Sequence, residues 1–273
     1  MGVRIARRLL DAGNEVVVWN RDPAKAARLV EHGAVNATSP AEAATRADAI
    51  LTMVSDPAAL RDVTEGPKGA AGAVTSEKTL IQMSTVAPAD VLRLAEALPP
   101  GSLLDAPVLG SVTEAESGTL TIFAGGPELV VERCGPLLSA LGSVVHVGPL
   151  GAGSSAKLVA NTTLLGILGV LGEALCLADA LRLSRDSAFE VLAATPLAAQ
   201  ASRRRPSLER GEYPPRFGLS LARKDADLIL DAAEASGADL RLTAAARTWF
   251  ADAEEAGLGG HDYSAVLERI IER

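Results

Sequence analysis

The sequence predicts an α/β fold, with a doubly wound parallel sheet in residues 1–150 followed by an all-helical domain in residues 151–273. Short apolar, β-branched runs alternate with helical segments through the first part and disappear from the second. Near-continuous apolar runs are typical of parallel strands that helices cover on both faces. Their alternation with helices indicates an open doubly wound sheet.

Five runs rich in Val, Ile, Leu and Thr predict the strands of the first domain. A helical pattern, Pro23–His32, lies between the first two, with proline at a first helical position and Gly33 just past the end. The strands are expected at Glu15–Trp19, Ala49–Val54, Thr79–Met83, Ser102–Ala106 and Val144–Val147, with an added strand in Gly118–Gly126.

Helical periods alone fill the second domain. From 157 to 181 the first helix is apolar on nearly every face, which predicts cover by its neighbours and by a partner subunit in a homodimer or homotetramer. The longest apolar stretch, Leu164–Leu171, is too short for a bilayer and contains two glycines, so no membrane is expected. The helices are expected at 154–183, 185–195, 220–236, 240–257 and 262–272.

The charge and the cysteines limit the possible partners and the compartment. The net charge is −8, and the basic run Arg203–Arg205 is predicted to be a solvated turn, so nucleic acid is not an expected partner. Cys134 and Cys176 have no metal-like or redox spacing, which favours reduced thiols. Arginines interrupt any leader-like run at the start, so the protein is expected in the cytoplasm. The three histidines are scattered and predict no metal site.

The chain opens on a helical segment, 3–12, followed by Gly13 and the strand at 15–19. A Rossmann-type unit has a strand, a G-x-G-x-x-G loop, a helix, a second strand and a ribose-reading residue. Gly2 can be the third glycine, but the first strand, which belongs in the middle of the sheet, is missing. We therefore expect the natural chain to begin about a dozen residues earlier, with a short apolar strand and G-x-G.

The ribose-reading position holds Asn20 and Arg21. A guanidinium there suits a 2′-phosphate, and Lys25 adds charge, so NADPH is predicted to be preferred, with NAD possible. The alternative is that Arg21 is only an exposed turn residue. Val54 and Ser55 end the strand at 49–54, where loops face the ligand crevice of such a sheet.

Five segments in this order resemble the β-hydroxyacid dehydrogenase family, which includes 3-hydroxyisobutyrate dehydrogenase and the glyoxylate/succinic semialdehyde reductases. The resemblance implies an NAD(P)-dependent oxidoreductase that acts on CH–OH and C=O groups, with a C-terminal domain like that of 6-phosphogluconate dehydrogenase. Imine reductases share the architecture but usually replace the lysine that is Lys157 here. The segments are MGVRIARRLLDAG, DAPVLGSVTEAESGTLTIFAGG, GAGSSAKLVAN, YPPRFGLSLARKDADL and GLGGHDYSAVLERI.

Lys157 and Asn161 stand four residues apart at the start of the long apolar helix, so they share one helix face. Reduction of a carbonyl by hydride creates an alkoxide that needs a proton. A lysine whose pKa is lowered by burial is a competent donor, and the asparagine can orient it. The alternative is a lysine whose stem lies on the helix while its ammonium reaches water.

The resemblance implies further site residues. Gly110 and Ser111 would hold a substrate carboxylate, although most of the family has serine where this chain has Leu109. Thr85 would lie near both nicotinamide and substrate, Phe217 and Asp225 would line the substrate pocket, and Lys224 would reach the cofactor.

The function predicted is hydride transfer between NADPH and a small carbonyl or hydroxy acid, with Lys157 as general acid/base. A second hypothesis is a catalytically silent homologue that binds a ligand or partner. The missing glycine loop favours this second hypothesis, and the intact Lys157 and Asn161 oppose it.

Overall fold

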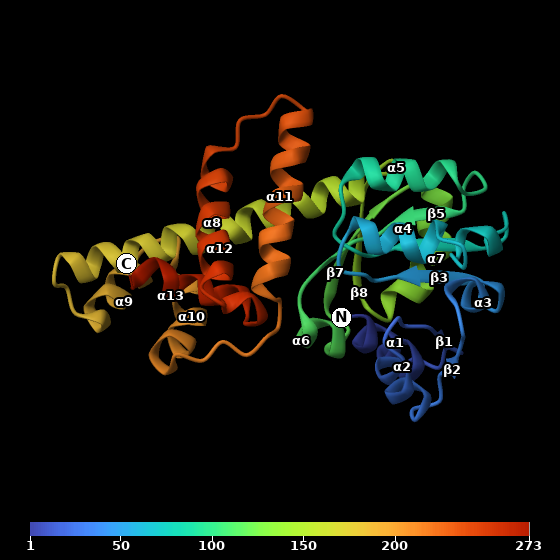
Figure 1. The fold of residues 1–273 in the computed structure, drawn as a ribbon, viewed down its shortest axis with the longest axis horizontal. Helices are drawn as coiled ribbons and strands as arrows, with labels where there is room; N and C mark the ends of the chain where they lie inside the picture. Colours follow the sequence, from blue (N-terminus) through green and yellow to red (C-terminus); the bar gives the residue numbers. More distant parts are fainter. Residues whose placement is uncertain (273) are drawn as a thin grey trace. The chain divides into compact units, whose positions relative to one another are not determined.

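The computed structural model describes residues 1–272, which form two compact units, Met1–Leu158 and Val159–Arg273 (Figure 1). The division falls inside the long helix α8, Ala152–Ala180, rather than between residues 150 and 151. Each unit is described by itself.

The first unit contains two sheets. The larger sheet has the order β3-β4-β5-β7-β6, and β8 pairs with β7. The pairs β3·β4 and β4·β5 are parallel, whereas β7 runs antiparallel to β5 and β6. The strands of this sheet are β3 (Ala49–Thr52), β4 (Thr79–Gln82), β5 (Leu103–Asp105), β6 (Val108–Leu109), β7 (Leu120–Gly125) and β8 (Gly142–Gly148).

The smaller sheet is a parallel pair of two short strands, β1 (Val17–Val18) and β2 (Val35–Asn36). Within residues 1–272, β3 pairs with β4 alone and β1 pairs with β2 alone. The parallel strands of the first unit thus lie in two separate sheets.

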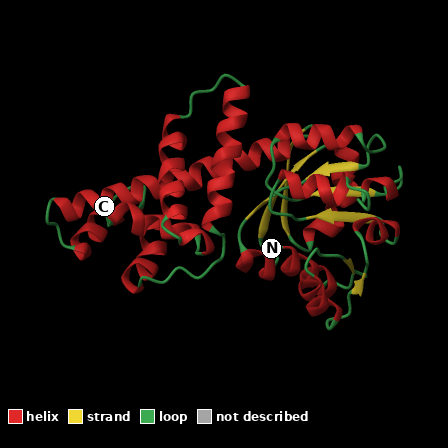
Figure 2. Ribbon diagram, in the orientation of Figure 1, coloured by secondary structure: helices red, strands yellow, loops and turns green. Residues whose placement is uncertain are grey.

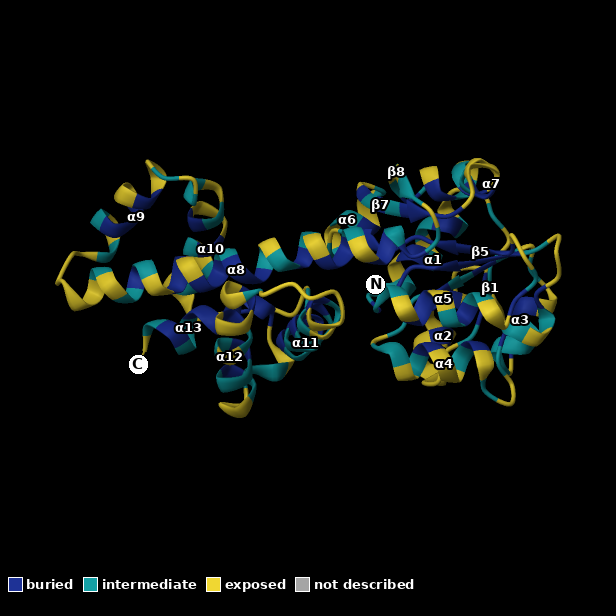
Figure 3. Cartoon of the chain, turned by 90° about the horizontal axis from the view of Figure 1, so that it is seen from above, coloured by how far each residue is buried: buried dark blue, intermediate teal, exposed yellow. Residues whose placement is uncertain are grey.

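Helices cover both faces of the larger sheet, as predicted for a doubly wound fold. Leu80 and Ile81 are neighbours on β4 but belong to two different hydrophobic clusters. One cluster contains apolar residues of α3, α4 and α5, and the other contains residues of α1, α6 and α7. Figure 3 shows β5 as buried. The helices are α1 (Gly2–Asp11), α2 (Pro23–Val30), α3 (Pro40–Thr45), α4 (Pro57–Glu65), α5 (Pro88–Glu96), α6 (Val112–Ser117) and α7 (Glu128–Ser139), with a 3₁₀ turn at Ala71–Ala73.

Local sequence explains where several of these helices begin. Asp22, Ser39 and Asp56 each accept a hydrogen bond from a backbone N–H of the helix that follows. In each case proline occupies the next position, where its fixed φ suits the first helical residue and its missing N–H is not needed.

The second unit is entirely helical in the part that the structure describes (Figure 2). Its helix α8 runs unbroken through Gly166 and Gly169 and corresponds to the helix expected at 154–183. By length and composition α8 could cross a membrane, with a mean hydropathy of 1.7, and 39% of its most apolar window is buried. The other helices are α9 (Arg185–Ala193), α10 (Ala198–Arg210), α11 (Leu219–Ala235), α12 (Arg241–Glu255) and α13 (Val266–Ile271), with 3₁₀ turns at Leu258–Gly260 and Tyr263–Ala265.

The basic run Arg203–Arg205 is not the solvated turn that the sequence suggested. It lies inside α10, and Arg204 is only 7% exposed. Its guanidinium donates to the Tyr263 hydroxyl at 2.7 Å and lies 3.5 Å from a carboxylate oxygen of Asp262. A buried ion pair therefore compensates the charge of Arg204. The nearby Pro206 had indicated a turn instead of a helix at this position.

Candidate active site and cofactor site

The amino end of α1 lies beside the carboxyl end of β3. A Cβ added to Gly2 would contact Met53, which directly follows that strand, at 3.8 Å. The helix begins without a side-chain cap, so its first N–H groups are available to an acceptor. The start of a helix next to the carboxyl end of a parallel strand fits the phosphates of a dinucleotide.

Asn20, Arg21 and Lys25 follow β1 and are exposed. The Asn20 side chain accepts from the Asp22 N–H at 2.9 Å, which closes the turn. Lys25 lies 3.9 Å from the Asp22 carboxylate, so part of its charge is offset. Arg21 has no hydrogen bond or ion pair within the described part of the chain, and its guanidinium is available for a phosphate.

The loops after β3 and β4 are joined by a small network. The Val54 N–H donates to the Ser84 hydroxyl at 2.9 Å. The Gln82 side chain donates to the Ser84 carbonyl at 2.9 Å and accepts from its N–H. This network fixes the turn that presents Thr85, which is half-buried. Ser55 donates to Asp56 at 2.6 Å, so its hydroxyl proton is used within the start of α4.

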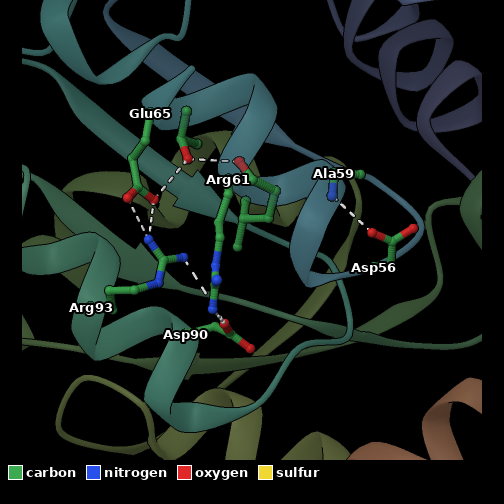
Figure 4. A network of polar contacts seen from close by, with 8 residues as sticks. Asp56, Ala59, Arg61, Glu65, Asp90 and Arg93 are labelled. Atoms are coloured by element: carbon green, nitrogen blue, oxygen red, sulfur yellow. Dashed lines mark hydrogen bonds and ion pairs between the residues drawn. The ribbon is translucent and has the colours of Figure 1, made fainter.

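Ion pairs clamp α4 to α5 behind these loops (Figure 4). Arg93 pairs with Glu65, and Arg61 lies 3.1 Å from the carboxylate of Asp90. Asp90 is only 8% exposed, whereas the Arg61 side chain is 57% exposed. The clamp holds the two helices that follow the loops after β3 and β4.

Gly110 and Ser111 lead into α6. Gly110 has a φ of 130°, and a Cβ there would lie 2.8 Å from Leu120 and 2.9 Å from Glu114, so only glycine fits. Ser111 donates both its N–H and its hydroxyl to Glu114, each at 2.7 Å. The Ser111 donors thus serve the capping of α6, which leaves the exposed Gly110 as the open part of this loop.

The first turn of α8 is joined to the end of β5. The Asp105 carboxylate accepts from the Ser154 N–H at 2.7 Å and from the Ser154 hydroxyl at 2.8 Å. Burial raises the pKa of Asp105 to about 6, although hydrogen bonds from Ser154 and Gln82 oppose the shift. Lys157 lies three residues beyond Ser154 and is only 9% exposed. The side chain of this lysine is thus almost entirely covered.

The second unit brings together three of the predicted residues. The Asn161 side chain donates to Asp225 at 2.6 Å, and the Lys224 ammonium lies 2.6 Å from the other oxygen of that carboxylate. Asn161 is 1% exposed and Asp225 is 2% exposed. Within the described residues the Asn161 carbonyl oxygen has no hydrogen-bond partner.

Phe217 lies apart from this cluster, in contact with Tyr263 at 5.2 Å between ring centroids. Its N–H donates to Asp262 at 3.2 Å, and Asp262 also accepts from the N–H and hydroxyl of Ser264. The half-buried phenylalanine is thus fixed by a buried polar turn.

Sequence reasoning missed Asp105 and Ser154. A signal was present, because an aspartate at the end of an apolar strand is an uncommon residue to bury. Its partner lies 49 residues away, and no local pattern links two such positions.

Comparisons with known proteins match both units of the chain. A family model for the NAD binding domain of 6-phosphogluconate dehydrogenase matches residues 1–148. A second, for the NAD-binding domain of NADP-dependent 3-hydroxyisobutyrate dehydrogenase, matches residues 151–270. Together the two matches cover most of the chain.

Individual relatives cover almost all of the chain. Glyoxylate/succinic semialdehyde reductase 1 of Arabidopsis thaliana is 34% identical over 99% of this chain and 95% of its own length. The 3-sulfolactaldehyde reductase of Escherichia coli is 34% identical over 99% of this chain and 92% of its own. The solved structure of Mycobacterium tuberculosis 3-hydroxyisobutyrate dehydrogenase with L-serine superposes with a TM-score of 0.87 at 28% identity, covering 98% of this chain and 94% of that one.

Both family models describe domains of dehydrogenases, and the relatives are named as reductases or dehydrogenases of hydroxy and aldehyde groups. The likeness extends over both units rather than over the nucleotide-binding half alone. The chain belongs to the β-hydroxyacid dehydrogenase family and is an NAD(P)-dependent oxidoreductase of that type.

Proposed function

We propose that this oxidoreductase reduces a small, carboxylate-bearing aldehyde or ketone with NADPH, and that Lys157 is its general acid. One observation carries the proposal: Lys157 is nearly buried on α8, one turn before an asparagine whose carbonyl oxygen has no partner within residues 1–272. Burying a polar oxygen without a hydrogen bond is costly, so a ligand or ordered water is its expected partner.

The nicotinamide supplies the hydride when it is bound. The Lys157 Nζ donates a proton to the carbonyl oxygen of the substrate as charge develops there, and the same nitrogen accepts that proton in the reverse reaction. Asn161 orients the reacting groups, because its amide is itself fixed by Asp225. Thr85, held by the turn at Ser84, contacts nicotinamide and substrate.

The loop at Gly110 and Ser111 receives the substrate carboxylate at the exposed Gly110, because the N–H and hydroxyl of Ser111 already donate to Glu114. Relatives named for glyoxylate, succinic semialdehyde and 3-sulfolactaldehyde support a small acidic carbonyl compound as the substrate class. From the family resemblance, Phe217 and Asp225 are substrate residues of this proposal and Lys224 is a cofactor residue. Leu109, where most of the family has serine, makes this loop less polar.

Arg21 carries the preference for NADPH, with NAD as a weaker cofactor. Its guanidinium is exposed and unpaired within the described chain, and it can bind a 2′-phosphate with two charge-assisted bonds. Gly2, Asn20, Lys25, Val54 and Ser55 complete the cofactor site. Arg21→Ala is expected to weaken NADPH binding about tenfold and to leave NADH binding nearly unchanged.

The enzyme assembles as a homodimer or homotetramer in the cytoplasm. Val159, Val170 and Leu177 on α8 are 68%, 42% and 59% exposed. A second copy that covers these side chains removes their apolar surface from water, which is favourable for a helix that is apolar on most faces. A monomer by light scattering at micromolar concentration would contradict this part of the proposal.

The test follows NADPH absorbance with glyoxylate, succinic semialdehyde and related carbonyl acids. Lys157→Ala should lower kcat by about two powers of ten or more, with NADPH affinity retained, because the lysine acts on the proton. Thr162→Ala, on the same helix, serves as the matched control. Turnover of Lys157→Ala at the wild-type rate would overturn the assignment, and an inactive wild type with intact NADPH binding would favour a silent homologue.

A further inference from the structure

Asp105 is a buried charge that the reaction itself does not require. It is 0% exposed at the end of β5 and is in no ion pair within residues 1–272. A carboxylate held in this way is costly unless hydrogen bonds compensate for the lost water. Two donors do so here, the N–H and the hydroxyl of Ser154, and Gln82 is the neighbour of Asp105 in the β4·β5 register.

Ser154 and Gln82 belong to the two segments that present catalytic groups in the first unit. Ser154 lies in the first turn of α8, one turn before Lys157. Gln82 lies at the end of β4 and also holds both the N–H and the carbonyl of Ser84, directly before Thr85. Asp105 therefore connects the turn at Thr85 to the helix that carries Lys157.

Close backbone packing makes this connection rigid. A Cβ on Gly153 would lie 2.4 Å from the Asp105 carbonyl oxygen, and a Cβ on Gly125 would lie 2.5 Å from the Gly153 nitrogen. The start of α8 thus rests directly on the backbones of β5 and β7.

We propose that Asp105 is a positioning residue, whose ionised carboxylate holds Lys157 and Thr85 in their relative places for the reaction. This inference rests on the proposed role of Lys157. An ionised carboxylate is only an acceptor, so it matches both donors of Ser154. Protonation makes one oxygen a donor and removes the charge that strengthens the other bonds. The groups that face Asp105 from β4, β7 and α8 are Gln82, Gly125 and Ser154, all uncharged.

The kinetic test compares Asp105→Asn with the wild type from pH 5 to 8, using saturating NADPH and the most active carbonyl acid. The pH profile of wild-type kcat should have an acidic limb, a fall in kcat as the pH drops below about 6, because burial raises the pKa of Asp105 to that range. Asp105→Asn should have about tenfold lower kcat at pH 7.5, no such limb, and a KM for NADPH changed less than about twofold. Ser154→Ala should lower kcat less and keep the limb.

A second measurement is independent of turnover. Hydrogen exchange of the Ser154 and Ser84 amides, corrected for intrinsic rates, should accelerate in Asp105→Asn. Asp90→Asn is the matched control, since Asp90 is also buried but lies in the clamp between α4 and α5. It should leave both amides and the pH limb unchanged.

The two measurements separate the possible failures. Wild-type kcat, pH limb and amide protection in Asp105→Asn would overturn the inference. Full activity in Lys157→Ala would overturn the proposed function alone, because exchange at Ser154 and Ser84 still reports on the connection.

Discussion

Asp105 and Asp225 are both buried carboxylates, one in each unit, but their partners differ in kind. Asp105 is held only by neutral donors, and its pKa is raised to about 6. Asp225 has an ammonium group 2.6 Å from one oxygen and an amide donor 2.6 Å from the other. The first carboxylate therefore changes its charge near neutral pH, whereas the second is held in an ion pair.

This difference has a physical consequence for each unit. In the first unit the charge fixes geometry at a cost in stability, since a neutral group would be easier to bury. In the second unit the charge is compensated, and removing it breaks the ion pair between Asp225 and Lys224. At neutral pH, replacing Asp105 by asparagine should therefore raise the free energy of unfolding, whereas replacing Asp225 by asparagine should lower it.

The largest effect should come from separating α8 from β5. In Gly153→Ala the new methyl group would meet the carbonyl oxygens of Asp105 and Phe123 at 2.4 and 2.5 Å. Neither backbone can give way easily, so the free energy of unfolding should fall by about 3 kcal/mol or more, measured by urea titration. Gly135→Ala is the control: nothing lies within 4 Å of its added Cβ in α7, and a gain of about 0.5–1 kcal/mol is expected. Equal stability of the two variants would show that the contact is loose.

The next effect concerns the ion-paired carboxylate. Asp225→Asn keeps the size of the side chain but removes the charge that pairs with Lys224 and accepts from Asn161. We expect a loss of about 2 kcal/mol in the free energy of unfolding, typical of hydrogen bonds to a charged group. Asp227→Asn on the same helix, where the side chain is 33% exposed, should cost much less. If Asp225→Asn is as stable as the wild type, the contrast with Asp105 fails.

The pH dependence of stability gives a smaller effect with a definite sign. The folded-state pKa of Asp105 lies above its ordinary value of 3.8, so the native state binds its proton more tightly than the unfolded state. This contribution to stability is complete below pH 3.8 and is lost as the pH rises through about 6. Relative to Asp105→Asn, the wild type should gain about 1 kcal/mol between pH 7.5 and 5. A constant difference across that range would place the folded-state pKa at its ordinary value.

Much of the fold could be predicted because its signals are local. Apolar runs located the strands β3, β4 and β5, and the change of pattern after residue 150 located the helical unit. The helix α10 was missed because Pro206 lies inside it and indicates a break. The short strands β1 and β2 depend on pairing with each other, and two residues carry little periodicity.

The site was predictable in part for the same reason. Lys157 and Asn161 lie four apart on one helix, and this spacing can be seen in the sequence. The contacts that orient them come from distant residues: Asn161 meets a carboxylate 64 positions away, and Ser154 meets one 49 positions away. The hydrogen bonds between Ser111 and Glu114 are local, and a serine followed three residues later by a glutamate is the pattern of a capping box.

The smallest effect should come from the partly exposed ion pair between Glu65 and Arg93 in the clamp. Its effect on stability is the reference with which both buried carboxylates are compared. Glu65 and Arg93 are 30% and 29% exposed, so water and salt screen their attraction. Glu65→Gln should lower the free energy of unfolding by about 0.5 kcal/mol, and 0.5 M salt should remove most of that loss. Urea titrations at low and high salt measure both quantities. A loss as large as that of Asp225→Asn would mean that burial does not distinguish these carboxylates, and that the helix clamp contributes as much as the ion pair in the second unit.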